Sequence, residues 1–405
     1  MKHLVLILFL LCSVLSQAQD KEKTFIISRN IGYTKLTESD SVKIMGFVET
    51  LQSKVKIPGP TLRYSEGDSV EITLWNVSQG APHTIHLHGL DVDQQNDGVP
   101  MLSFEVEHMD KGYYRFKAPH PGTYLYHCHV VSPIHVQAGM YGLLIVEPKD
   151  LPSYTWKNGY RFEREYHYLS SEIDSNWHTV AFFKEHHSGT HFPLSIPDYN
   201  PQYFLLNGNS GLLPELMDTI KAQGDKNTLL RLANVGFEAN YYVFPERLKA
   251  LVVSSDGRPL PKPTLIDTLH LFPGERYQVL LQPETDAFFD EKIVLQYYAL
   301  HNHKDLYKRD LLVRVDDFSG LGEGPKPELE LFPNPVIDQL HIQLNSAEKV
   351  KASVFNLAGE VVFEEELWPS AEFLDLSELK SSMYTIEVQL KNGLRLRESF
   401  FKAKN

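Results

Sequence analysis

Hydrophobic and polar positions alternate along much of this 405-residue chain. The alternation is clear at residues 69–75, and short β-branched or aromatic runs follow at residues 122–127 and 142–147. A period of two is typical of a strand with one buried face, because successive side chains point to opposite faces. We therefore predict strands at these positions. Similar runs recur at residues 203–208, 228–234, 273–280, 339–344 and 384–390.

Proline and glycine separate these runs, as at residues 57–60 and 119–122. Many short strands between such turns favour Greek-key β-sandwiches or barrels. We predict an all-β chain with two Greek-key β-sandwich domains followed by a small immunoglobulin-like β-sandwich. The expected division is a signal segment at 1–19, a first domain at 20–149, a second domain at 150–315, a glycine- and proline-rich linker at 316–327 and a C-terminal module at 328–405.

The net charge of the chain limits its binding partners, and its first residues indicate where the protein is located. The formal net charge of −13 argues against a nucleic-acid partner, because phosphate backbones are bound through basic surfaces. Residues 1–19 combine a short charged start, an apolar run and small residues, which is the pattern of a secretory signal peptide. The apolar run is too short to span a membrane, and no other run reaches that length. We expect an exported protein without a membrane span.

The cysteine count narrows the chemistry. The chain has two cysteines, and cleavage of the signal segment would remove Cys12 and leave Cys128 alone. An exported protein with one cysteine forms no intrachain disulfide, although its compartment is oxidising. A metal bound to the thiolate would protect it, because a bound thiolate is no longer a free nucleophile.

Histidines cluster in two short segments around this cysteine. Residues 83–88 read HTIHLH, and residues 127–129 read HCH. On a strand, His86 and His88 share one face, whereas His83 has the opposite parity. His127 and His129 likewise share a face, and Cys128 points the other way. Two separate sites are expected.

The first expected site joins Cys128 with His83, His135 and Met140. A thiolate, two imidazoles and a weak thioether favour copper that cycles between two oxidation states. Zinc sites have other ligand spacings. The second site gathers the remaining imidazoles, and the backbone at Cys128 links the two sites. The imidazoles of this second site are His86, His88, His127 and His129.

The first domain resembles a multicopper oxidase cupredoxin domain. The motifs that carry the resemblance are IPGPTL at 57–62, EGD at 66–68, HTIHLHG at 83–89, DGVP at 97–100 and HCH at 127–129, with His135 and Met140. The resemblance implies that His83, Cys128, His135 and Met140 hold a type 1 copper. It also implies a type 2 copper at His86 and a type 3 pair at His88, His127 and His129. At Asp97 it implies a carboxylate that orients copper-bound water and relays protons, with a solvated turn as the alternative.

Two departures from the family pattern leave the second site open. The spacing from Cys128 to His135 exceeds the usual oxidase spacing by two residues and lies between the oxidase pattern and that of copper nitrite reductases. The family draws two further histidine pairs from another domain, but the second domain here offers one clean pair, His301 and His303. These two either complete the site, in one reading from a neighbouring subunit of a homo-oligomer, or lie in an exposed turn.

The C-terminal module resembles the sorting domain of the type IX secretion system. The residues that carry the resemblance are LFPNP at 331–335, VFNLAG at 354–359, LDLSEL at 374–379, Met383-Tyr384 and FFKAK at 400–404. This resemblance implies passage through the periplasm and then release or attachment at the cell surface.

The leading prediction is therefore an exported, laccase-like copper oxidoreductase. A small molecule or a protein would donate electrons, and dioxygen would accept them. One alternative is a nitrite-reductase-like copper enzyme, although His86 stands where that family has a catalytic aspartate. Another is an electron-transfer or copper-binding protein in which only the type 1 site is intact.

Overall fold

A computed structural model of the chain separates it into two compact units, residues 1–317 and 318–405. The signal segment predicted at 1–19 lies outside the described residues, and so does the predicted linker apart from Asp316. The division into domains at the predicted boundaries stays a prediction. The described residues are 22–186, 198–212, 219–224, 226–283, 288–316, 329–344, 350–357, 359–367, 373–389 and 395–403.

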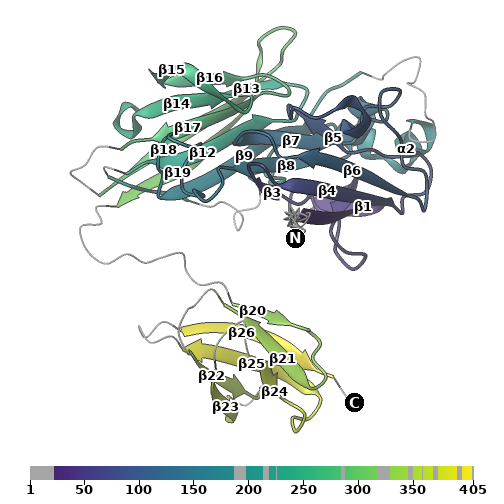
Figure 1. The fold of residues 1–405 in the computed structure, drawn as a ribbon, viewed down its shortest axis with the longest axis vertical. Helices are drawn as coiled ribbons and strands as arrows, with labels where there is room; N and C mark the ends of the chain where they lie inside the picture. The colour runs from purple at the N-terminus through teal and green to yellow at the C-terminus, as the bar shows by residue number, and fades with distance from the viewer. Residues whose placement is uncertain are drawn as a thin grey trace, which may run out of the picture. The chain divides into compact units, whose positions relative to one another are not determined.

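The predicted all-β architecture is confirmed, and two four-stranded sheets form the N-terminal sandwich (Figure 1). One sheet has the order β2-β1-β4-β6, with β1 parallel to β4, and the other has the order β3-β8-β7-β5. Neighbours within each sheet are often distant in sequence, as Greek-key connections require. The strands of the first sheet are β1 (Glu22–Lys35), β2 (Ser41–Val48), β4 (Ser69–Asn76) and β6 (Lys111–Lys117). Those of the second are β3 (Leu62–Ser65), β5 (His86–His88), β7 (Gly122–His127) and β8 (Tyr141–Glu147).

A second sandwich follows in the same unit. Its six-stranded sheet has the order β10-β9-β12-β17-β14-β15, and its five-stranded sheet has the order β11-β19-β18-β13-β16. The six-stranded sheet contains β9 (Arg164–Ile173), β10 (Tyr203–Leu206), β12 (Thr228–Asn234), β14 (Ala250–Ser255), β15 (Arg258–Ile266) and β17 (Arg276–Leu281). The five-stranded sheet contains β11 (Ile220–Gln223), β13 (Ala239–Val243), β16 (Thr268–Leu271), β18 (Phe289–Tyr298) and β19 (Asp305–Asp316).

Helices in the described residues are short and lie in the connections between strands. The helix α1 (Ser132–Gln137) connects β7 to β8, and α2 (Val180–His186) follows the 3-10 turn η2 (Ser175–His178). Two further 3-10 turns are η1 (Gln94–Asn96) and η4 (Glu246–Leu248). No helix among the described residues has both the length and the apolar character needed to cross a bilayer.

The two sandwiches share apolar cores. Leu125 and Ile145 of the first sandwich belong to one buried cluster with Leu169 and Ala233 of the second. Figure 1 shows β7 and β8 next to β9 and β12, which agrees with the contacts of β7 with β12 and β17. Because burial of apolar area drives association, the shared core fixes the second sandwich against β7.

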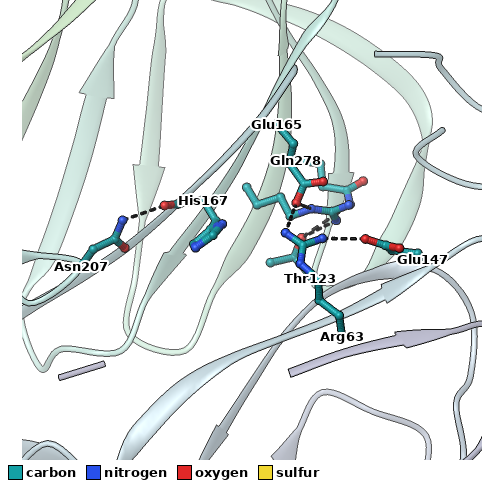
Figure 2. A network of polar contacts seen from close by, with 8 residues as sticks. Arg63, Thr123, Glu147, Glu165, His167, Asn207 and Gln278 are labelled. Carbon is teal, nitrogen blue, oxygen red and sulfur yellow. Dashed lines mark hydrogen bonds and ion pairs between the residues drawn. The ribbon is translucent and has the colours of Figure 1, made fainter. Parts of the chain in front are cut away.

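A polar network crosses the same boundary (Figure 2). The Arg231 side chain is only 1% exposed, and its Nε donates to a Glu165 carboxylate oxygen at 2.8 Å. Its Nη1 donates to the Thr123 hydroxyl of β7 at 3.0 Å. Arg63 of β3 donates to the same Glu165 oxygen at 2.9 Å and to Glu147 at 2.6 Å. A buried guanidinium is tolerated only when such partners compensate for lost hydration.

The C-terminal unit has its own core, with a three-stranded sheet in the order β20-β21-β24 and a four-stranded sheet in the order β23-β22-β25-β26. Two facing antiparallel sheets of this size match the predicted small β-sandwich. Its strands are β20 (Glu330–Phe332), β21 (Gln339–Gln343), β22 (Val350–Phe355), β23 (Val361–Leu367), β24 (Phe373–Asp375), β25 (Ser382–Gln389) and β26 (Arg395–Lys402).

Candidate metal centres

The first candidate centre lies at the end of β7, where Cys128 follows the last strand residue. The backbone N–H of Cys128 donates to the carbonyl of Met140 at 3.0 Å, and the N–H of Met140 donates to the carbonyl of His135 at 3.0 Å. Helix α1 therefore folds back over the cysteine. His83 enters from another segment, whose backbone forms an isolated bridge with Val106.

Three side chains converge at this centre. The Cys128 Sγ atom lies 3.1 Å from Nδ1 of His135 and 3.5 Å from Nδ1 of His83. All three ligand atoms lie within 4.8 Å of one another. Atoms that share one small cation at about 2.0–2.3 Å lie roughly 3–4 Å apart, so this arrangement fits a single metal ion.

The surroundings of the thiol are dry. Cys128, His83, His135 and Met140 are each 0% exposed. Burial raises the pKa of the Cys128 thiol to about 12, since a thiolate without a counter-charge is poorly solvated there. A bound metal cation would supply that charge and bind the thiolate. The donor set and its burial fit copper.

The second candidate centre lies on the face of β5 and β7 that carries His86, His88 and His127. His86 pairs with His127 across the two strands. His86, His88 and His127 each offer a ring nitrogen within 4.8 Å of the others. The Nδ1 atom of His88 lies 3.3 Å from Nε2 of His127. The alternating parity of the two strands therefore separates these three imidazoles from the thiol.

Hydrogen bonds fix which nitrogen of each ring is available. The Nδ1 of His86 donates to the carbonyl of Asp97 at 2.8 Å, and the Nδ1 of His127 donates to the carbonyl of Cys128 at 3.0 Å. In a neutral imidazole with a protonated Nδ1, the lone pair is on Nε2. Both rings are therefore oriented as metal ligands commonly are, with one nitrogen held and the other available.

Burial also keeps the imidazoles of His88 and His127 neutral. It lowers the pKa of His127 to about 3, and the neighbouring histidines contribute to the shift. The pKa of His88 falls to about 4, first through burial and then through the positive charge of Arg276 and the neighbouring His86. A neutral imidazole has the lone pair that a metal requires.

His129 and Asp97 lie at the edge of the second centre. The His129 ring centroid lies 5.2 Å from that of His86, outside the tight three-imidazole group. Its backbone N–H donates to the Thr84 hydroxyl at 2.9 Å. The Asp97 carboxylate lies 3.2 Å from Nδ1 of His86 and is 27% exposed, so it connects the imidazole with solvent.

His301 and His303 lie apart from both candidate centres. They occupy the exposed turn between β18 and β19, where the His303 ring stacks on Tyr298. Within the described ranges of one chain, neither histidine joins a group of ligand atoms. The structure therefore leaves their predicted role as ligands untested.

Two residues of the second sandwich that the sequence did not suggest lie against the second centre. A Cβ atom added at Gly274 would lie 3.3 Å from Nε2 of His88, and one added at Gly89 would lie 2.1 Å from a guanidinium nitrogen of Arg276. Arg276 is 4% exposed and pairs with Asp256 at 2.8 Å. No local signal could have shown these contacts, because they join residues nearly two hundred positions apart.

Comparison with known families identifies three domains. Models described as multicopper oxidase match residues 38–151 and 175–303, together more than half of the chain. A model described as a secretion system C-terminal sorting domain matches residues 330–400 and points to secretion or the cell surface. Both resemblances inferred from the sequence are confirmed.

Individual relatives agree with this assignment. A copper resistance protein A homolog from Pseudomonas syringae pv. tomato is 29% identical over 264 residues, which cover 57% of this chain and 44% of the relative. The chain thus spans less than half the length of this curated relative.

Solved structures share the fold. A blue copper oxidase from Nitrosomonas europaea is 26% identical with a TM-score of 0.57, and the match covers 73% of this chain and 86% of that one. A copper nitrite reductase from Nitrosomonas europaea is 18% identical with a TM-score of 0.51, over 75% of this chain and 98% of that one, and shows the fold alone.

Members of the matched family bind type 1, type 2 and type 3 copper, and the donor groups described above fit that metal. The predicted copper cofactor is therefore confirmed for the chain as a family member. On its two matched oxidase domains, the chain belongs to the multicopper oxidase family, with a secretion sorting domain at its C-terminal end.

Proposed function

We propose that this protein is an exported copper oxidase that oxidises an external reductant and reduces dioxygen to water. Four one-electron oxidations of the donor, together with four protons, balance the conversion of one dioxygen to two waters. The observation that carries the proposal is the position of Cys128. Its sulfur belongs to the buried first centre, and the adjacent His127 belongs to the second.

The two centres are covalently connected through a single peptide bond. Copper bound at them would supply the one-electron redox chemistry. The chain contributes a short path, since the Cys128 carbonyl also accepts the hydrogen bond of the His127 ring at 3.0 Å. His83, His135 and Met140 would complete the type 1 site, and His86, His88, His127 and His129 would provide the chain's ligands to the second.

Asp97 has a role in proton supply under this proposal. Its carboxylate lies beside His86 and is partly exposed, so it can exchange protons with solvent. Its carbonyl holds the His86 ring at the same time. Asp97 would thus orient one ligand and deliver protons that the reduction of dioxygen consumes.

The second centre needs further ligands for an oxidase, and we propose that His301 and His303 provide them from another copy of the chain. Both histidines are exposed in the isolated chain and lie outside its own ligand groups. A homo-oligomer would bring this turn to the second centre of a neighbour. The reducing substrate would be a small molecule or a protein.

A second candidate is a nitrite-reductase-like enzyme. In this reading His88, His127 and a histidine from another copy of the chain would hold one copper ion, and the close approach of the His88 and His127 rings favours it. Against it stands His86, where that family has an aspartate. A carrier in which only the Cys128 centre holds copper is the third candidate.

The proposed route of export combines two segments. A signal peptide at residues 1–19 would direct the chain to the periplasm, and the sorting domain would then direct its release or attachment at the cell surface. The experiment is fractionation of cells expressing the full chain and a chain ending at residue 327. Retention of the shortened chain in the periplasm is expected, and equal release of both would contradict this route.

Copper content and oxygen consumption distinguish the three functions. We expect four copper ions per chain and oxygen uptake with a phenolic donor that stops when the copper is removed. Two copper ions with turnover of nitrite would favour the second candidate. One copper ion without turnover of either acceptor would leave an electron carrier.

A further inference from the structure

Gln137 is the last residue of α1 and lies two positions after His135. The residue is only 5% exposed although its side chain is polar. A buried amide is costly unless its donors and acceptor are satisfied. The partners of Gln137 therefore show what holds the end of this helix.

Its hydrogen-bond partners all come from beyond the first sandwich. The Nε2 atom donates to the carbonyl of Glu172 and to the hydroxyl of Tyr199, both at 3.0 Å. The Oε1 atom accepts from the backbone N–H of Asp174 at 3.1 Å and lies 3.3 Å from Nε2 of His178. The end of α1 is thus anchored to β9 and the segments that follow it.

The same segment also packs into the core of the first sandwich. Trp177, Phe182 and Phe183 belong to the buried cluster that contains Cys128 and Ile134. The Nδ1 of His178 lies 2.6 Å from the carbonyl of Lys43, which attaches the segment to β2 as well. Residues 172–183, with Tyr199, therefore form a brace across the helix that carries His135.

Helix α1 depends on such support. It has six residues, and its N-cap, Val131, has a left-handed φ of 42° and offers no capping side chain. Helices this short are marginal on their own, because nucleation costs more than so few hydrogen bonds return. Tertiary contacts must therefore fix its position. The Met45 backbone N–H donates to the carbonyl of the C-cap residue Ala138 at 2.8 Å, and the Gln137 side chain makes the polar contacts to the second sandwich.

We propose that Gln137 is a positioning residue through which the brace of the second sandwich sets the placement of His135 relative to Cys128. The inference rests on the proposed type 1 site. It extends that site, because the buried Gln137 amide and its hydrogen-bond partners would help to determine the geometry of the thiolate and imidazole ligands. None of the Gln137 hydrogen bonds described above is made with the Cys128 sulfur or the His135 ring, so Gln137 would act through the helix backbone.

The first test uses the metal-free full chain with Cys12→Ser in every protein, so that Cys128 is the thiol whose reactivity is followed. Cys128 is 0% exposed, so a small aromatic disulfide reagent can reach it only after local opening. Gln137→Met keeps a similar side-chain volume and removes all the hydrogen bonds. We expect thiol modification to accelerate by about tenfold or more, because each lost net hydrogen bond is worth on the order of 1 kcal/mol.

Two further variants separate bracing from general instability. Tyr199→Phe removes one hydroxyl of the brace and is expected to accelerate the reaction by a smaller factor. Gln296→Met removes another buried glutamine, whose amide donates to carbonyls of Tyr297 and Tyr307 in the second sandwich. It is expected to leave the thiol rate unchanged. Equal acceleration in Gln137→Met and Gln296→Met, or none in Gln137→Met, would overturn the proposal.

The second test uses the copper-loaded proteins. We expect Gln137→Met to weaken the blue absorption band per bound copper and to shift the reduction potential, whereas Gln296→Met keeps both. An unchanged band and potential in Gln137→Met would contradict the proposal. If the thiol rates differ as expected and no protein is blue, the brace exists but the type 1 site, on which the proposed function depends, is wrong.

Discussion

The Cys128 sulfur lies 3.1 Å from Nδ1 of His135, and both side chains are closed off from solvent. The two residues are seven positions apart, and helix α1, which contains His135, returns the chain to the thiol. A thiol and an imidazole held this close in a dry site fit a shared metal ion better than a solvated pair. This relationship underlies the first centre and, through His127, its connection to the second.

Asp97 offers a test of proton supply. Asp97→Asn keeps the backbone carbonyl that orients His86 and removes the ionisable group. We expect the rate of oxygen uptake to fall by about 10²-fold, which is typical of the loss of a general acid or base, while the copper content stays the same. The measurement is steady-state oxygen consumption on protein with verified copper content.

Asp93→Asn is the matched control, because Asp93 lies on the same loop and caps η1. Asparagine caps about as well as aspartate, so the fold of the loop should persist. Equal losses of rate in the two variants would remove Asp97 from the proposed proton path.

His301 and His303 test whether the second centre is shared between copies. The double variant His301→Ala/His303→Ala should lower the copper content per chain and abolish oxygen uptake, because the second centre loses ligands. The blue band should remain, since the Cys128 centre is separate from that turn. Elemental analysis and the optical spectrum measure both quantities.

His341→Ala, in the C-terminal unit, is the control for removal of a histidine from the chain. A double variant with wild-type copper content and turnover would show that the turn is not part of a metal site.

The strands and the two-site arrangement could be predicted from sequence, because both follow from a period of two. The run at residues 122–127 became β7 without a change of boundary. The parity of HCH and HTIHLH predicted that Cys128 and His127 would serve different groups. Such signals are local and repeat along the strand, so they can be read from a single sequence.

The brace and the domain contacts could not be predicted. Helix α1 has too few residues to show a helical period, and the Gln137–Glu172 hydrogen bond joins residues 35 positions apart. Arg276 approaches Gly89 only because the two sandwiches share a core. Contacts of this kind depend on tertiary packing, which hydrophobic patterns do not encode residue by residue.

The buried guanidinium at the boundary of the sandwiches should contribute to stability. Arg231→Met would remove one donor from Thr123 and one from Glu165, although Gln278 would still donate to Thr123 and Arg63 to Glu165. We expect a loss of about 3 kcal/mol in the free energy of unfolding, as for other broken buried pairs. Urea unfolding of the metal-free protein gives the value.

Arg314→Met is the comparison, because Arg314 pairs with Asp290 at the surface. It should cause no measurable loss, since exposed ion pairs contribute little. Similar losses of unfolding free energy in both variants would show that the interdomain network contributes no more to stability than a surface ion pair.

Glu172 should make stability depend on pH. Burial raises its pKa to about 7, in spite of hydrogen bonds from Tyr199 and from the backbone of Phe237 and Glu238, and the nearby Glu238 charge adds to the rise. The folded state therefore holds a proton that the unfolded state releases near pH 4.5. Stability from this group should be full below pH 4.5, fall as the pH rises to 7 and stay level above it.

Glu172→Gln removes this titration while it keeps a similar shape. Relative to the variant, the wild-type protein should lose roughly 1–3 kcal/mol of unfolding free energy between pH 4.5 and 7.5. Urea unfolding of the metal-free proteins across that range measures the difference. A difference that stays constant with pH would show that Glu172 titrates normally.

The optical spectrum of the copper-loaded protein, compared with that of Cys128→Ser, tests the central claim most directly. We expect an intense blue band in the wild-type protein, no such band in the variant and one copper ion fewer per chain. Colourless wild-type protein with full copper content, or a variant with an unchanged spectrum, would show that the sulfur of Cys128 does not bind the metal.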